Sequence, residues 1–426
     1  MQESNIFPWR RNDGFFCADR LSGGRSGSLR HVTLRATVCS AVSKRPMVIG
    51  RCVLIGSTPL AARRVAKIGL LYGSRERHVS EKYLFEAFKP TEIFEFDLDL
   101  FQPDSSVSDL IQFAARRGAP FSHLVHYIGA PGLPRSLHCA PLPTACLNID
   151  TFSWLPSRLR WAMLFDFVFV WQPCFVPAFR QAGHPKVFLL PHAVDGRLFD
   201  REERTRSFEL GWVGGLGLAQ YTRRDRIIPM LATRFRMNEF RRRHSKQETA
   251  QVYQQSRIVV NVTRDEFPRE ANMRCYEAMA GGALLIAPTP TELTELGFRE
   301  GEHFVGWREE GEIADLVTHY LAHESKRRAI ARAGQDLVLK EHTFQCRKET
   351  FLAVLEQHGD QFFAPARGWP IEQVQLTYLE YYYKHLIFSA LLQEFQSLRK
   401  TNRGAAWKGV PMVLRALRHG LLRSLK

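Results

Sequence analysis

A short polar segment in the second half of the chain has residue types that suit the binding of an anion. Residues 272–280 have the apolar spacing of a helix, and Gly281 and Gly282 end it. Asn272 is a suitable residue to cap the start of this helix, and Arg274 adds a positive charge close to it. Because the first turn of a helix presents unpaired N–H groups and about half a positive charge, the segment predicts a site for a diphosphate.

A second pair of glycines follows a predicted strand at residues 208–213. Gly214 and Gly215 allow a ligand to approach the backbone closely, although such a pair is also found in ordinary turns. Arginines follow at 223, 224 and 226, and we take Arg223 as the one that meets the phosphates. The arginines at 241–243 are interpreted as a solvated face.

Two polar residues follow predicted strands in the first half of the chain. His126 and Asp150 lie at the carboxyl ends of these strands, the edge that faces the ligand crevice in open α/β sheets. Each is a candidate general base for an acceptor hydroxyl, and a structural or cleft-lining role is the alternative. Asp97 and Asp99 form a D-x-D pair, but the alternating apolar residues around them favour an exposed strand end. No metal site is therefore predicted.

Apolar strands alternate with helical windows along most of the chain, which is typical of βαβ units and parallel sheets. Strands are predicted at 65–72, 92–96, 123–128, 145–149, 167–171, 186–190, 208–213, 257–262 and 283–287, and helices at 81–88, 106–117, 245–255, 272–280 and over 312–357. The helix at 245 begins with the capping box Ser245-Lys-Gln-Glu248. The predicted fold class is α/β, with two Rossmann-like domains, a central cleft and a helical C-terminal extension.

The domain boundaries follow from this pattern. We expect a poorly ordered basic arm at 1–45, an N-terminal Rossmann-like domain at 46–190, a C-terminal one at 191–360 and a helical basic extension at 361–426. The arm is interpreted either as a flexible segment or as sequence upstream of a start near Met47.

The composition is that of a folded protein with a large positive charge. Hydrophobic residues make up 45% of the chain, and the formal net charge is +16. This charge attracts nucleic acid, acidic lipid headgroups or phosphorylated substrates. No nucleic-acid-binding signature is present, so nucleic acid is not expected as a partner. The eight cysteines include no C-x-x-C pair, which favours reduced thiols and a cytoplasmic location.

Residues 404–426 predict a cationic amphipathic helix without acidic residues. Val413, Leu414, Leu417, Leu421 and Leu425 recur at steps of three and four. Two interpretations remain open. The helix either lies on an anionic membrane, as a peripheral contact at the inner membrane surface, or packs across the protein's own domains.

The stretch Asn272-Met-Arg-Cys-Tyr-Glu-Ala-Met-Ala-Gly-Gly-Ala-Leu-Leu-Ile-Ala287 resembles the donor-site signature of GT-B-fold glycosyltransferases. The resemblance is closest to the spore-maturation (CgeB-type) family. It extends over about residues 187–350 and includes Pro191-His192-Ala-Val-Asp195, Gly211-Trp-Val-Gly-Gly215, Gly301-Glu-His-Phe-Val305 and Glu341-His-Thr343 before Arg347. The first domain is similar only in its general layout.

The resemblance implies a transferase that moves a sugar from a nucleotide-diphosphate donor to an unidentified acceptor, whether polymer, lipid-linked or protein. It implies no cofactor beyond the donor and no metal, with the acceptor on the N-terminal domain and the donor on the C-terminal one. Glu277 is expected to accept hydrogen bonds from ribose hydroxyls, and His192 either contacts the donor or is structural. The other expected donor-binding residues are Gly214, Gly215, Arg223, Asn272, Arg274, Gly281 and Gly282.

The chain departs from the family pattern at one position. Many retaining relatives carry a second glutamate eight residues before the helix glutamate, where this chain has Arg269. The nearest acid, Glu270, is one residue off, so we assign no retaining mechanism. A catalytically inactive GT-B scaffold and a basic nucleic-acid-binding protein remain as alternative functions.

Overall fold

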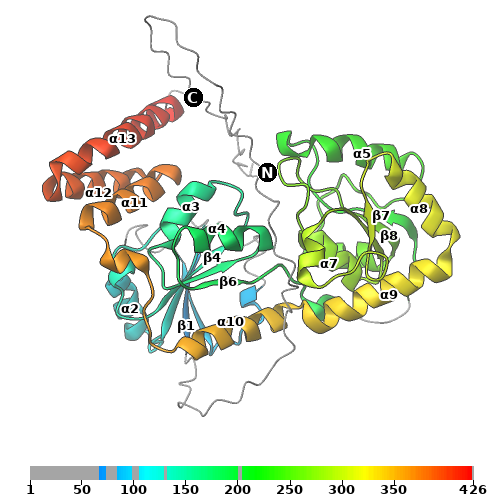
Figure 1. Ribbon diagram of the computed structural model, residues 1–426, viewed down its shortest axis with the longest axis horizontal. Coiled ribbons are helices and arrows are strands. Elements are labelled where there is room, and N and C mark those ends of the chain that lie inside the picture. Colours follow the sequence, from blue (N-terminus) through cyan, green and yellow to red (C-terminus); the bar gives the residue numbers. More distant parts are fainter. Residues whose placement is uncertain (1–66, 73–83, 98–104, 129–131, 200–203, 425–426) are drawn as a thin grey trace, which may run out of the picture. The chain divides into compact units, whose positions relative to one another are not determined.

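The computed structural model describes residues 67–72, 84–97, 105–128, 132–199 and 204–424, and the expected arm at 1–45 lies outside these ranges. The described chain forms two parallel sheets (Figure 1). The first has the order β2-β1-β3-β4-β5-β6, and the second has the order β10-β9-β8-β7. The strands are β1 (Ile68–Tyr72), β2 (Ile93–Asp97), β3 (His123–Tyr127), β4 (Thr144–Asn148), β5 (Phe167–Val170), β6 (Val187–Leu189), β7 (Phe208–Gly211), β8 (Ser256–Val260), β9 (Leu284–Pro288) and β10 (Val305–Trp307).

The strands are apolar on both sides because helices cover both faces of each sheet. In β5, Phe167 and Phe169 belong to one core, whereas Val168 and Val170 belong to the other. The second sheet is divided between two cores in the same way. The covering helices are α2 (Val107–Arg116), α3 (Leu155–Ala162), α4 (Val176–Gln181), α5 (Thr222–Ala232), α6 (Lys246–Gln254), α7 (Met273–Ala280), α8 (Glu312–Ala322) and α9 (Glu324–Glu341).

The α/β fold class with two Rossmann-like sheets is confirmed. The capping box at the start of α6 is also confirmed, since Ser245 and Glu248 each accept a hydrogen bond from the other's backbone N–H. The sequence pattern missed α3, α4, α5 and the three-residue strand β10. These elements are short or rich in charged residues, so their apolar periodicity is weak.

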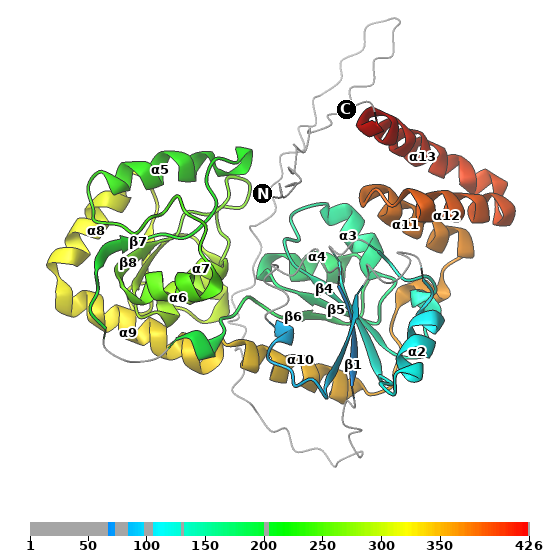
Figure 2. The ribbon, with the colours of Figure 1, turned by 180° about the vertical axis from the view of Figure 1, so that it is seen from behind.

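The last four helices return to the first sheet. They are α10 (Phe344–His358), α11 (Ile371–Lys384), α12 (Phe388–Thr401) and α13 (Arg403–Ser424). Phe351 and Leu355 of α10 share a core with β1 and β5, and Figure 2 shows α10 beside the first sheet. The sequence had placed α10 in the C-terminal domain, because its helical pattern continues directly from α9. The structure instead packs it on the first sheet.

Helix α11 is fixed to the first sheet's loops by tyrosine hydroxyls. Tyr378 donates to the carbonyl of Pro134 over 3.0 Å, and Tyr382 donates to that of Leu133 over 2.8 Å. Tyr378, Tyr381 and Tyr382 of this helix are therefore part of the core of the first sheet. None of the helices in the described part of the chain is long and apolar enough to cross a bilayer.

The buried guanidinium of Arg347 holds the connection between the two sheets. It donates to the carbonyl of Pro191 over 2.9 Å, to that of His192 over 3.2 Å and to that of Glu341 over 3.0 Å. It also lies 2.7 Å from the ring of His342. One side chain at the start of α10 thus satisfies backbone groups from two separate segments.

We predict that Arg347→Met lowers the free energy of unfolding by about 3 kcal/mol, because several buried acceptors lose their donor. Urea denaturation measures this loss. The matched control is Arg332→Met on α9, whose guanidinium is exposed and pairs with Asp336 over 3.4 Å. We expect the control to change stability by about 0.5 kcal/mol or less. Equal effects of the two substitutions would contradict the role given to Arg347.

Candidate active site

The candidate site lies at the carboxyl edge of the second sheet, where β7 and β8 end. Leu210 of β7 forms a parallel bridge with Met237 on one side, and β7 pairs with β8 on the other. The segment that follows β7 thus reaches Met237 on one side of β7, and the next strand, β8, lies on the opposite side. This reversal of direction makes the carboxyl end of β7 and β8 a topological switch point. In open α/β sheets, ligands bind at such points.

The side chain of Arg274 builds this edge. Its guanidinium is buried, donates to the carbonyl of Val213 over 2.8 Å and 3.1 Å, and donates to Oδ1 of Asn261 over 2.8 Å. It also stacks on the ring of Trp212 at 3.8 Å. The predicted positive charge is therefore present, but its hydrogen bonds go to the loops that follow β7 and β8.

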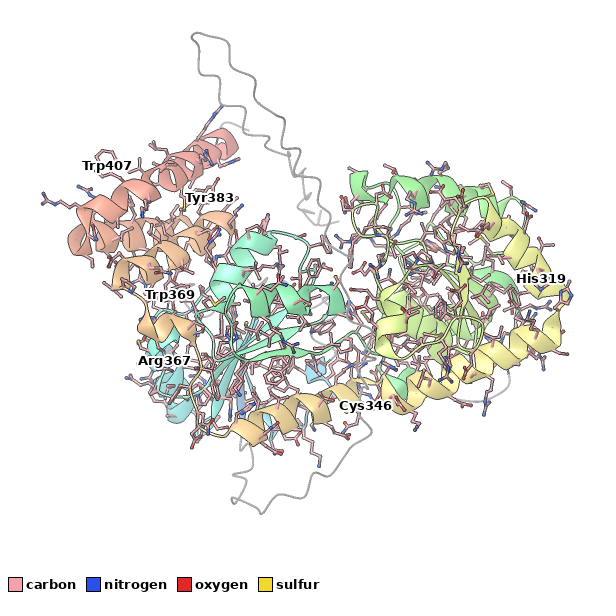
Figure 3. All side chains as sticks on the ribbon, in the orientation of Figure 1. His319, Cys346, Arg367, Trp369, Tyr383 and Trp407 are labelled. Carbon is pink, nitrogen blue, oxygen red and sulfur yellow. The ribbon has the colours of Figure 1, made fainter. Side chains whose placement is uncertain are left out.

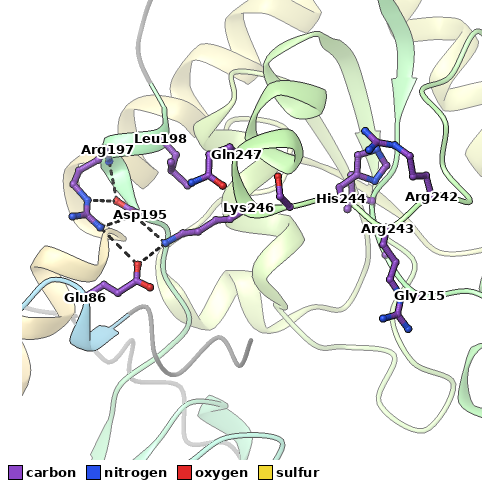
Figure 4. A pocket seen from close by; sticks show the side chains of 13 residues that line it. Glu86, Asp195, Arg197, Leu198, Gly215, Arg242, Arg243, His244, Lys246 and Gln247 are labelled. Carbon is purple, nitrogen blue, oxygen red and sulfur yellow. Dashed lines mark hydrogen bonds and ion pairs between the residues drawn. The ribbon is translucent and has the colours of Figure 1, made fainter. Parts of the chain in front are cut away.

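The two glycines after β7 are explained by what surrounds them. A Cβ at Gly214 would collide with Nη2 of Arg274, and one at Gly215 would lie 3.1 Å from the ring of Tyr221. Both glycines line a pocket of about 980 Å³. The other lining residues are Glu86, Asp195, Arg197, Leu198, Val213, Arg242, Arg243, His244, Ser245, Lys246 and Gln247 (Figure 4).

Basic side chains dominate one wall of this pocket. Arg242 and Arg243, which the sequence assigned to a solvated face, are exposed and also line the pocket. Lys246, at the start of α6, donates to Glu86 over 2.9 Å and to Asp195 over 3.0 Å (Figure 4). Burial raises the pKa of Asp195, but hydrogen bonds from Arg197 and Lys246 outweigh it and lower this pKa to about 2. The charged network was not predicted, because its members are far apart in sequence.

Glu277 lies on α7 near the charges of Arg274 and Lys246. Its side chain is half-buried and makes no hydrogen bond with any residue that the structure describes. Burial raises the pKa of Glu277 to about 7, although the two neighbouring cations oppose the shift. A half-buried carboxyl that lacks a protein donor suits recognition of a hydroxyl pair.

A second acid, Glu270, is brought to the site by the loop before α7. Its side chain is only 4% exposed, and burial together with the charge of Asp150 raises its pKa to about 7. Arg269 points elsewhere and pairs with Glu295 over 3.3 Å. The segment before Asn272 is not helical, so counting residues along a helix could not tell which of positions 269 and 270 faces inward.

Asp150 joins this group from the first sheet. Its carboxylate lies 3.5 Å from the guanidinium of Arg264, which itself lies over the ring of Phe152. Asp150 has a φ of +50°, a backbone region that residues other than glycine rarely adopt. Such conformations cluster at functional sites.

Several predicted site residues lie away from this group. His126 is fully buried beside Tyr381, and burial lowers its pKa to about 3. His192 is also buried, next to Trp171, and burial followed by the charge of Arg347 lowers its pKa to about 3. Both rings are neutral and closed off from solvent, which favours the structural alternative for His192 and leaves Asp150 as the reachable candidate base.

Two neighbouring arginines of α5, the expected phosphate ligand Arg223 and Arg224, differ in their surroundings. Arg223 is engaged by Glu310 over 2.8 Å, whereas Arg224 is buried over the ring of Tyr221 at 3.9 Å. Burial, followed by the charge of Arg274, lowers the pKa of Arg224 to about 10. Arg224 is therefore the inward-facing member of the group.

The ends of α7 differ in their surroundings. Asn272 occupies the N-cap position, but its side chain donates to Asn261 over 3.2 Å and accepts no capping hydrogen bond from the backbone. Gly281 and Gly282 lie at the opposite end, where a Cβ would meet Tyr253 or Arg206. These two glycines serve packing and are not among the pocket residues.

Solved structures of other proteins resemble this fold. HepE from Anabaena, solved with UDP and glucose, matches with a TM-score of 0.50 at 15% identity, over 68% of this chain and 100% of that chain. The fold is GT-B. Sucrose-phosphate synthase from Thermosynechococcus elongatus matches with a TM-score of 0.50 at 12% identity, over 68% of this chain and 98% of its own. No curated protein matches the sequence.

The sequence of the second GT-B sheet carries a family signature. Residues 203–353 match the family described as glycosyl transferase-like. The match includes Glu270, Arg274 and Glu277, and it excludes Asp150. The narrower resemblance to the spore-maturation family remains a prediction. Among the described residues, no three His, Cys, Asp or Glu side chains gather in a group that could hold a metal.

We predict that Glu277 makes a contribution to stability that is lost as the pH rises from about 4.5 to 7, because the pKa of Glu277 is about 7 in the folded chain and 4.5 is its usual value. In this window the Glu277 carboxyl binds more protons in the folded state than in the unfolded state. Glu277→Gln removes this contribution. When the pH is raised from 4.5 to 8, the free energy of unfolding of the variant should increase by about 2 kcal/mol relative to that of the original chain. Urea denaturation measures this difference. Exposed Glu239→Gln is the control and should gain nothing.

Proposed function

We propose that this chain transfers a sugar from a nucleoside-diphosphate donor to an acceptor, and that the pocket beside Gly214 and Gly215 binds the nucleotide. The observation that carries the proposal is the position of Glu277, whose unbonded carboxyl lies close to Lys246 of the pocket wall. The structures of HepE contain UDP or UDP-glucose, so uridine nucleotides are the first to test.

The proposed roles follow from charge and position. Glu277 accepts hydrogen bonds from the ribose hydroxyls. The first turn of α7, together with Arg224 and Arg264, stabilises the negative charge that develops on the leaving diphosphate. Preorganised groups of this kind act strongly because the surrounding protein holds them in place before the reaction.

The two acids near Arg264 differ in exposure, and we assign them different roles. Asp150 is partly exposed and is the proposed general base for the acceptor hydroxyl. Glu270 is nearly fully buried with a pKa of about 7, so a large fraction is protonated at neutral pH. In that state it can donate a hydrogen bond to a sugar hydroxyl as well as accept one. The stereochemical outcome and the acceptor are not assigned.

The first test is calorimetric titration with UDP, GDP and ADP. We expect at least one to bind, and Glu277→Ala to weaken its binding by about 10- to 150-fold, the effect of losing a hydrogen bond to a charged group. Glu239→Ala is the control for the loss of one acidic side chain. If none of the three binds at millimolar concentration, the proposal is wrong. Binding without transfer or hydrolysis of any nucleotide sugar would support the inactive scaffold instead.

A further expectation is that donor binding and turnover do not change when EDTA is added. The N–H groups of the first turn of α7 and the guanidinium groups of Arg224 and Arg264 can balance the negative charge of the phosphates. A divalent cation is therefore not required for that purpose. The measurement is the rate of nucleoside-diphosphate release with and without EDTA. A rate that falls in EDTA and recovers with manganese or magnesium would contradict this expectation.

A further inference from the structure

The surface of α13 is divided into three strips along the helix. Ala406, Val413 and Ala416 are buried, because they pack on α11 and α12. Gly409 belongs to the same strip and fits closely against Leu379 and Phe395. Packing on the protein itself, one of the two interpretations of this segment, therefore uses only one side of the helix.

A second strip is apolar and exposed. Trp407 is 75% exposed, Leu414 is 61% exposed and Leu417 is 44% exposed. At 100° per residue these side chains fall within about 80° of one another on the helix. Figure 3 shows Trp407 projecting away from the neighbouring helices. The sequence had grouped Val413 with Leu414 and Leu417, but the structure separates them, because a helical step of one residue turns the side chain by about 100°.

The third strip is cationic. It contains Lys408, Arg415 and Arg418, and Arg403 lies near the start of the helix. None of these four makes an ion pair with a residue that the structure describes. In contrast, Arg299 and Arg328 elsewhere on the surface pair with acids. Residues 403–426 contain no Asp or Glu, so the positive charge of this helix is not neutralised locally.

We propose that the exposed strips of α13 dock the protein on an anionic lipid surface. Cations beside an apolar strip that includes a tryptophan suit the boundary between headgroups and acyl chains. A second copy of the chain is disfavoured, since joining two such helices would bring like charges together. Nucleic acid is disfavoured, because the aliphatic Leu414 and Leu417 offer nothing to phosphates and do not stack on bases. This inference uses residues outside the candidate site and does not depend on the proposed transferase activity.

The test is flotation of the full chain with vesicles of pure phosphatidylcholine and with vesicles that also contain phosphatidylglycerol. We expect binding only to the anionic vesicles, and weaker binding in high salt. The combined change Trp407→Ser, Leu414→Ser and Leu417→Ser should abolish it. Because these side chains are exposed, the variant should unfold at the original temperature. Met230→Ser, Phe362→Ser and Ile371→Ser, which change three exposed apolar residues elsewhere, should bind as the original chain does.

Two further measurements distinguish the contribution of the cationic strip to vesicle binding from the insertion of the apolar strip into the bilayer. Arg415→Gln with Arg418→Gln should weaken the partition coefficient by about thirtyfold, whereas Arg328→Gln with Arg332→Gln on α9 should have much less effect. Lipids with brominated acyl chains should quench part of the tryptophan fluorescence, and Trp407→Phe should remove that quenching. Together these results would place Trp407 within the bilayer interface.

Three outcomes would overturn the proposal. The first is undiminished vesicle binding by the triple serine variant. The second is equally tight binding to soluble polyglutamate that does not depend on Trp407, which would indicate an acidic polypeptide partner. The third is a vesicle-free dimer in sedimentation velocity that the serine variant disrupts, which would make α13 an interface between copies.

Discussion

The candidate site depends on one buried guanidinium. Arg274 joins three segments that are remote in sequence: the loop after β7 through Val213, the loop after β8 through Asn261, and the start of α7 itself. A guanidinium has five N–H donors in a fixed plane, so it can bond several carbonyls at once in a way that lysine cannot. Its position also requires glycine at 214, because any side chain there would occupy the same space. The glycine that suggested a ligand site in the sequence is thus needed for packing as well.

Buried charge of both signs is concentrated around this arginine. Glu270, Glu277 and Glu292 each have a pKa of about 7, in every case mainly because of burial. Carboxyl groups are rarely kept in such surroundings unless they serve a site, since burial destabilises their charged form. Arg224 and Arg274 lie close enough to Glu270 and Glu277, respectively, to lower their pKa values.

The two sheets are joined by polar contacts as well as by the chain. Arg347 holds the connecting segment 191–192 against α10, and Lys246 links α6 to Glu86 and Asp195. The first contact is buried and serves the fold. The second lines the pocket, where a phosphate would compete for the same ammonium group. The helices α10 to α13 then complete the core of the first sheet, so the C-terminal end of the chain stabilises its N-terminal half.

From the sequence alone, the two-sheet α/β class, the strands β1 to β9, the capping box of α6 and a glycine pair after β7 could be predicted. These features are local: strand runs such as Phe167–Val170 are buried on both faces, and a helix start needs only the residues within one turn. The tertiary structure decided which polar residues meet. It buried His126 and His192, turned Arg224 inward instead of Arg223, brought Glu270 beside Asp150, and set Trp407 and Leu414 apart from Val413. Those outcomes depend on loop conformation and on packing between segments that are tens to hundreds of residues apart in the sequence. A shift of one residue changes the direction in which a side chain points, and the periodicity of the sequence does not reveal such a shift in a loop.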